Sequence, residues 1–123
     1  LSSANSINWG RLAPQIAYYV SAYCDMLNRG DIQMGDAINV CVPTGNFGNI
    51  LAAYFAKQMG VPIAKLVCAS NENNVLTDFF RSGDTYDRNR PFHTTISPSM
   101  DILISSNLER LLFLGVRVYR ETC

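Results

Sequence analysis

The fold class of this chain can be predicted from residues 37–69, AINVCVPTGNFGNILAAYFAKQMGVPIAKLVCA. This stretch opens with a short apolar run rich in Val and Ile, 37–42, which is typical of a strand buried on both faces of a parallel sheet. An Ala-rich helical stretch, 50–59, ends at Gly60, and a second apolar run, 65–69, predicts another strand. The order strand, glycine loop, helix, strand predicts an α/β fold with a βαβ unit, parallel strands and flanking helices.

Periodicity predicts a helix before this unit. Pro14 stands where a helix favours its first residue, and Gly30 offers a C-terminal stop. Between them, apolar side chains recur at helical spacing: Ile16, Tyr19, Val20, Tyr23 and Leu27.

Two more helices are predicted after the unit. One covers about 73–81, and another begins after Ser106 and Glu109, which have capping-box spacing. The polar segment 84–99 predicts a loop, and a loop of that length is usually functional or braced by neighbouring parts of the protein. Residues 101–105 could be extended, and 116–123 show no clear pattern. We expect these apolar pairs to lie in the core: Phe79–Phe80 and Leu111–Leu112.

The composition excludes several classes of protein. With 48% hydrophobic and 16% charged residues, the chain has ordinary globular usage, so we do not expect disorder. Ten basic residues balance ten acidic ones, whereas a nucleic-acid or anionic-membrane surface needs clustered Lys and Arg. The apolar runs are far shorter than the roughly 20 residues that span a bilayer. The N-terminal segment lacks a basic region and an apolar stretch, so we expect a cut end rather than a signal peptide.

The cysteines indicate a reduced, cytoplasmic protein. No pair has CxxC spacing, and one histidine, His93, completes no familiar zinc site with them. We expect His93 to be a surface residue of the polar loop. We expect buried free thiols at the four positions Cys24, Cys41, Cys68 and Cys123.

The glycine loop between strand and helix carries the most chemical information. Main-chain N–H groups at a helix start have no intrahelical acceptor, and the helix dipole adds positive potential there. Glycines let the main chain turn sharply and approach an anion closely, while Thr and Asn side chains add donors. We therefore expect a phosphate cradle without a cationic side chain, formed by Thr44, Gly45, Asn46, Phe47, Gly48 and Asn49.

Other glycine-rich loops have different signatures. The loop contains neither GxGxxG, which marks dinucleotide binding, nor the lysine of GxxxxGK[ST]. A cradle without a cation suits one phosphate monoester at the end of a cofactor. On the motif alone, the alternative is an ordinary tight turn from strand to helix.

Four collinear blocks of this sequence resemble the threonine synthase family, which depends on pyridoxal phosphate. They cover nearly the whole chain to about Leu112, so together they are far more specific than the loop alone. The blocks are SANSINWGR at 3–11, VPTGNFGNILA at 42–52, ASNEN at 69–73 and SPSMDIL at 97–103.

The resemblance implies a fold type II enzyme with two open sheets and the cofactor between its domains. The family converts O-phospho-L-homoserine and water into L-threonine and phosphate, with a lysine that holds pyridoxal 5'-phosphate as a Schiff base. The glycine loop would hold the cofactor's phosphate. The whole chain, 1–123, would be one partial domain, the cofactor-phosphate-binding part of the large domain.

Two further groups of polar residues are candidates by the same resemblance. Asn5, Ser6, Asn8 and Arg11 would contact the substrate's phosphate, since Arg matches phosphate oxygens with its fork; helix capping ahead of Pro14 is the alternative. A second group follows the second strand, where ligands collect in open α/β sheets, although we favour a helix N-cap for it. This group is Ser70, Asn71 and Asn73.

The resemblance also predicts what the chain lacks. Neither Lys57 nor Lys65, the only lysines, matches the family's Schiff-base lysine, so we expect these 123 residues to be inactive alone. The alternative is a stand-alone phosphate-binding or protein-interaction module descended from such an enzyme. Self-association would then cover the exposed edge of its small sheet. A ligand-free adaptor is a third interpretation.

Overall fold

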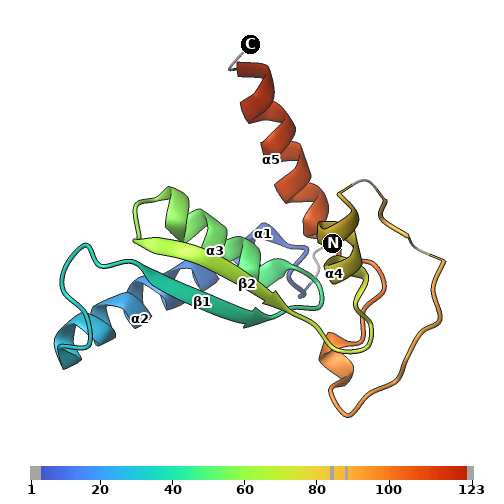
Figure 1. Cartoon of the computed structure of the whole chain (residues 1–123), viewed down its shortest axis with the longest axis horizontal. Coiled ribbons are helices and arrows are strands. Elements are labelled where there is room, and N and C mark those ends of the chain that lie inside the picture. Colours follow the sequence, from blue (N-terminus) through green and yellow to red (C-terminus); the bar gives the residue numbers. More distant parts are fainter. Residues whose placement is uncertain (1–3, 84, 88, 122–123) are drawn as a thin grey trace. The chain divides into compact units, whose positions relative to one another are not determined.

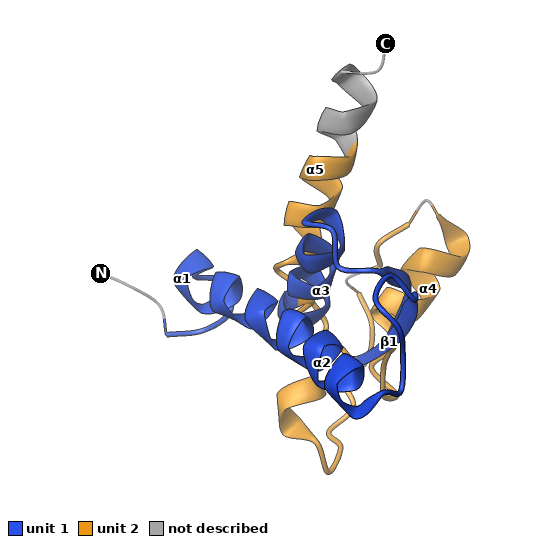
Figure 2. Ribbon diagram, turned by 90° about the vertical axis from the view of Figure 1, so that its left-hand side faces the viewer, with its two compact units in different colours: residues 1–42, 48–67 blue, residues 43–47, 68–123 orange. Residues whose placement is uncertain are grey.

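The computed structural model describes residues 4–83, 85–87 and 89–121, with side chains up to residue 115. The chain divides into two compact units, 1–42 with 48–67 and 43–47 with 68–123 (Figure 2). The prediction of one partial domain stays a prediction. The elements in chain order are α1 (Trp9–Leu12), the 3-10 helix η1 (Ala13–Gln15), α2 (Ile16–Arg29), β1 (Ile38–Pro43), α3 (Gly48–Gln58), β2 (Ile63–Ala69), α4 (Val75–Ser82), the 3-10 helix η2 (Pro98–Met100) and α5 (Leu108–Glu121).

The βαβ unit is confirmed. Strands β1 and β2 form a two-stranded parallel sheet, with both arrows pointing the same way in Figure 1, and α3 connects them in sequence. At one end of the ladder the Ile38 N–H donates to the Pro62 carbonyl at 2.9 Å. At the other end the Thr44 N–H donates to the Ala69 carbonyl at 2.7 Å. The carboxyl ends of both strands therefore lie at the same edge of the sheet.

The predicted N-terminal helix is confirmed, with its stop at the predicted position and its start shifted. Pro14 lies in η1, and α2 begins two residues later at Ile16. Helix α2 ends at Arg29, and its C-cap Gly30 has a left-handed φ of 78°. Helix α1 was not predicted, because four residues are too few for a periodic pattern. Asn8 caps α1: its side-chain oxygen accepts from the Gly10 N–H at 2.9 Å.

Unit 1 has its core where α2 and α1 pack against α3. Leu12 and Leu51 are fully buried, and Trp9 meets Phe55 edge to face with ring centroids 5.5 Å apart. The alanines of α3 also face inward, and their small side chains let the helices approach closely.

The expectation of a doubly buried first strand is wrong for the described chain. Only Val42 of β1 is buried, while Asn39 and Cys41 are exposed. The buried-thiol expectation fails for the same reason, since Cys24 is exposed and Cys68 half-buried, although these cysteines are free. The helices of the described chain do not cover both faces of the two-stranded sheet, as a doubly buried strand requires. Cys123 lies outside the described residues.

Unit 2 has a smaller core than the periodicity predicts. Helix α4 buries Val75 and Leu76 and ends at Gly83, with a φ of 72°. The expected core pairs are only partly covered: Phe79 and Leu111 are half-buried, Phe80 is 50% exposed and Leu112 is 47% exposed. Both helices thus keep part of their apolar faces open.

The C-terminal segment corrects three expectations. Residues 101–105 form no strand, and 116–121 continue α5 as a helix, whereas 122–123 lie outside the described residues. Helix α5 begins at Leu108, two residues after Ser106, so the predicted capping box is out of register. None of the described helices is long and apolar enough to span a bilayer.

We expect Leu51→Ala to destabilise the protein by about 2–5 kcal/mol, because it opens a cavity in the unit 1 core. Leu51 is fully buried, whereas Leu112 is 47% exposed and serves as the matched control. Chemical denaturation of the protein, followed by circular dichroism, measures the free energy of unfolding of both variants. Equal effects of Leu51→Ala and Leu112→Ala would contradict this core assignment.

Candidate functional site

The glycine loop leaves β1 and leads directly into α3, which begins at Gly48. Thr44 is buried, and its main-chain bond to Ala69 ties the loop to the end of β2. Phe47 has a left-handed φ of 63°, which is unusual for a bulky residue and costs on the order of 1–3 kcal/mol. Its ring is buried 6.1 Å from the ring of Phe80. The surrounding packing therefore holds the loop in a conformation that the chain alone disfavours.

The segment just before α5 braces the loop from within unit 2. The Ser105 hydroxyl donates to the Gly45 carbonyl at 2.5 Å, and the Asn107 N–H donates to the Asn46 carbonyl at 3.3 Å. The Asn46 side-chain oxygen accepts from both the N–H and the hydroxyl of Ser106, at 2.9 and 2.5 Å. Sequence analysis missed this role, although the run of small hydroxyl and amide side chains at 105–107 was its signal.

Gly45 is required by a close approach of protein rather than by a sharp turn. A Cβ built on it would lie 3.0 Å from Ile102 Cδ1, 3.2 Å from the Ser99 carbonyl oxygen and 3.3 Å from Met100 Cα. Two of these are main-chain atoms, which cannot move aside as the end of a side chain can. The close approach seen at this glycine is therefore to residues 99–102, whereas the expected approach to an anion stays a prediction.

Asn49, the last residue of the predicted cradle, has its side chain engaged within unit 1. Its amide donates to the Gln15 side-chain oxygen at 2.9 Å, and the Tyr19 hydroxyl donates to both Asn49 oxygens. Burial raises the pKa of Tyr19 above its ordinary value of 10.0. The Asn49 side chain thus anchors the first turn of α3 to α2, and its part in phosphate binding stays a prediction.

A cavity of about 230 Å³ lies at the carboxyl ends of the two strands, within unit 2. Ligands collect at this edge of open α/β sheets. The lining combines hydroxyl and amide groups with apolar atoms and contains no charged side chain. Its residues are Pro43, Thr44, Ala69, Ser70, Asn71, Ser97 and Met100.

The polar residues after β2 are not the N-cap that we favoured. The N-cap of α4 is Asn74, without a side-chain capping bond. Ser70 Oγ instead lies 2.8 Å from Thr77 Oγ1, and Asn71 Oδ1 accepts from the Asn73 N–H at 3.0 Å. Asn73 is buried and bonded to the main chain of the 84–99 loop, so this group fastens loops to one another.

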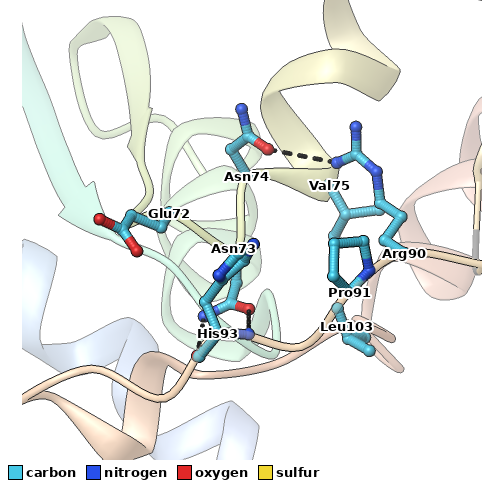
Figure 3. A pocket seen from close by; sticks show the side chains of 8 residues that line it. All are labelled: Glu72, Asn73, Asn74, Val75, Arg90, Pro91, His93 and Leu103. Atoms are coloured by element: carbon cyan, nitrogen blue, oxygen red, sulfur yellow. Dashed lines mark hydrogen bonds between the residues drawn. The ribbon is translucent and has the colours of Figure 1, made fainter.

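A second cavity, of about 170 Å³, has Asn73, Arg90 and His93 among its lining residues (Figure 3). Asn73 exchanges two hydrogen bonds with the main chain of His93, at 2.8 and 3.0 Å. Arg90 donates to Asn74 at 3.2 Å and forms an ion pair with Asp78. The Arg90 charge is thus already balanced, and His93 is exposed, as we predicted.

The predicted substrate block lies in unit 1. Asn8 caps α1, which confirms the capping alternative for that residue, and Asn5 Oδ1 accepts from the Ile7 N–H at 3.1 Å. Ser6 is half-buried and Arg11 is exposed. No observation here tests a role of Asn5, Ser6, Asn8 or Arg11 toward a substrate, so that role stays a prediction.

We compared the sequence and the fold of the chain with those of known proteins. No family model matches the chain. Threonine synthase of Saccharomyces cerevisiae is 48% identical over 119 residues, 97% of the chain. Its solved structure matches 94% of the chain with a TM-score of 0.84. The chain is homologous to a segment of the threonine synthases. The structure of pyridoxal-phosphate-bound threonine synthase from Brucella melitensis is similar as well, with 50% identity, a TM-score of 0.80 and 92% of the chain covered.

The similarity concerns only part of those proteins. The chain spans 22% of the yeast threonine synthase and 23% of the Brucella structure. It is also 61% identical, over 93% of its length, to the human protein named threonine synthase-like 1, of which it spans 15%. The α/β class, the parallel strands and the threonine synthase resemblance predicted from the sequence are confirmed.

We expect Gly45→Ala to destabilise the protein by about 1–3 kcal/mol, because the added methyl group overpacks against the main chain of 99–102. The matched control is Gly115→Ala in α5, where a Cβ meets nothing within 4 Å. That change should be neutral or stabilise by up to about 1 kcal/mol, because Ala favours helix more than Gly does. Thermal unfolding of both variants measures the difference, and a Gly45→Ala protein as stable as the parent would contradict the close approach.

Asp101 should make stability depend on pH at the acid end. Its pKa lies below the ordinary 3.8, chiefly because the Thr95 main-chain N–H donates to the carboxylate; burial opposes this, and the side chains of Thr95, Asn71 and Asn73 lower the pKa further. This stabilisation is complete above about pH 4, the unfolded pKa of Asp, and is lost as pH falls through the lowered folded value. Acid unfolding of the parent and Asp101→Asn should therefore converge at low pH. Curves that stay parallel would refute this linkage.

Proposed function

We propose that this chain forms the cofactor-phosphate-binding part of a cytoplasmic, pyridoxal-phosphate-dependent threonine synthase. The full-length protein would convert O-phospho-L-homoserine and water into L-threonine and phosphate. The observation that carries the proposal is the braced loop of residues 44–49, in a segment half identical to a threonine synthase whose structure contains the cofactor. In this proposal Thr44, Gly45, Asn46, Phe47, Gly48 and Asn49 hold the cofactor's phosphate.

The residues present fit a phosphate monoester. The loop supplies main-chain N–H groups at the start of α3 and the buried hydroxyl of Thr44. The Gly45 and Asn46 carbonyls, which would repel an anion, accept hydrogen bonds from Ser105 and Asn107 instead. Since the helix dipole favours negative charge at this end, the cradle needs no cationic side chain.

The cofactor supplies an electron sink when it is bound, and this chain's residues position it. Neither lysine is suited to hold it covalently at the loop. Lys57 Nζ donates to the Ala64 carbonyl at 2.9 Å, and Lys65 is exposed on β2. We therefore place the Schiff-base lysine outside these residues, and we propose that the 123-residue chain is inactive alone.

The substrate would be recognised by its phosphate as well. Arg11 carries a guanidinium whose planar fork matches two phosphate oxygens, and Asn5, Ser6 and Asn8 add short polar groups nearby in sequence. Asn8 caps α1 with its side-chain oxygen, and its amide group carries the N–H donors that a phosphate oxygen would accept from. The block is therefore compatible with both helix capping and phosphate contact.

A second candidate function has one observation in its favour. The 61% identity to threonine synthase-like 1 exceeds the 48% identity to yeast threonine synthase. The second candidate is therefore a protein of the threonine synthase-like 1 kind, which shares the loop of 44–49 but does not form threonine from O-phospho-L-homoserine. Incubation with O-phospho-L-homoserine separates the two, because only a threonine synthase yields threonine and phosphate in equal amounts.

We expect pyridoxal phosphate, followed by borohydride reduction, to add one covalent group to the full-length protein and none to the 123-residue chain. Intact mass gives the stoichiometry, and peptide mapping gives the modified lysine. A stoichiometric adduct on Lys57 or Lys65 would contradict the proposal that the chain is inactive alone and would favour a self-contained module. Sedimentation of the chain is the companion measurement, since a stable folded dimer also favours the module.

A further inference from the structure

Asp101 accepts hydrogen bonds from two other segments of unit 2. Its Oδ2 accepts from the Thr95 N–H at 2.8 Å, and its Oδ1 accepts from the Thr95 hydroxyl at 2.8 Å. The same Oδ1 accepts from the amides of Asn71, at 2.7 Å, and Asn73, at 3.2 Å. One carboxylate therefore joins the loop after β2, the 84–99 loop and the segment after η2.

Two of the groups that Asp101 organises line the cavity at the strand ends. Asn71 is one of them, and its amide is directed by Asp101 and by Thr95 Oγ1, at 3.3 Å. Ser97 is the other: its N–H donates to Thr95 Oγ1 at 3.1 Å, and Thr95 is itself held by Asp101. Thr44, the first residue of the phosphate cradle, lines the same cavity. Asp101 thus orients Asn71 and Ser97, which line the same cavity as Thr44.

We propose that Asp101 is a positioning residue that holds Asn71 and Ser97 as the polar wall of the cofactor cavity. The proposal rests on the proposed function and deepens it, because it assigns the wall to the part of pyridoxal phosphate beyond its phosphate group. The loop of 44–49 binds the phosphate, whereas the wall recognises the rest of the cofactor. Asp101 itself does not line the cavity and acts through its neighbours.

A carboxylate is suited to this role because both of its oxygens only accept. Asparagine at position 101 would keep one acceptor oxygen but place an NH₂ group against a donor, either the Thr95 N–H or the Asn71 amide. The wall would then lose at least one charge-assisted hydrogen bond, of the kind that outweighs a neutral one. The cradle has its own support from Ser105 and Ser106, so it should survive the change.

The test compares two ligands in the full-length protein carrying Asp101→Asn. Affinity for pyridoxal phosphate, titrated by its absorption, should fall about tenfold, as expected for one lost charge-assisted hydrogen bond. Affinity for inorganic phosphate, measured as competition against the cofactor, should stay unchanged. A purely structural role would weaken both ligands together, and no role would weaken neither; either outcome overturns the proposal.

Two further variants keep the test decisive. Thr95→Val preserves shape and the main-chain donor but removes the hydroxyl that links Asp101 to Ser97, so it should weaken the cofactor selectively as well. It decides the case if Asp101→Asn fails to fold by circular dichroism. Asp87→Asn is the matched control, because Asp87 is an exposed acid of the same loop whose Oδ1 accepts from the Asn89 N–H at 2.9 Å. A parent protein that binds no pyridoxal phosphate would refute the proposed function itself, whatever the variants do.

Discussion

The hydrogen bonds from residues 105–107 to the glycine loop are the interaction on which unit 2 depends. They join segments sixty residues apart, and they satisfy the Gly45 and Asn46 carbonyls and the Asn46 side-chain oxygen. The left-handed φ of Phe47 and the burial of the polar Thr44 side chain both raise the free energy of an isolated loop. The bonds from residues 105–107 help to hold the loop in this conformation. A cradle built from main-chain donors is only as rigid as its backbone, so in the proposed function these distant contacts would hold the loop in the conformation that binds the anion.

The same logic explains why polar side chains are buried around the site. Asn73, Asn107 and Ser105 are almost inaccessible, and every buried side-chain polar atom among the described residues has a partner. A fully satisfied network is directional, so it fixes the loops in one arrangement, whereas apolar packing alone tolerates slippage. Hydrogen bonds between loops therefore shape the cavity at the strand ends, to which the strands contribute Pro43 and Ala69.

The sequence predicted local features well and long-range ones poorly. The βαβ order, the start of α2 near Pro14 and its stop at Gly30 follow from neighbours a few residues apart, and the structure confirms them. The bonds of Ser106 to Asn46 and of Asn71 to Asp101 join residues far apart in sequence, so local patterns suggested capping instead. The prediction that Cys41 and Phe80 are buried was wrong. Periodicity identifies the apolar face of a helix or strand, but it does not show which other element packs against that face.

This division between local and long-range features also bears on function. The proposed phosphate cradle is local in sequence, so its motif was recognisable, and the chain is 48% identical to the Saccharomyces cerevisiae threonine synthase over 97% of its length. In the proposed function, the Schiff base needs a lysine that another part of the protein brings to the loop. Lys57 Nζ donates to the Ala64 carbonyl and Lys65 is exposed on β2, which is consistent with that proposal. If the loop holds the cofactor's phosphate while another segment holds its reactive end, a mutation can leave the fold intact and still abolish activity. In the proposed function, binding of phosphate and binding of the whole cofactor are therefore separable properties.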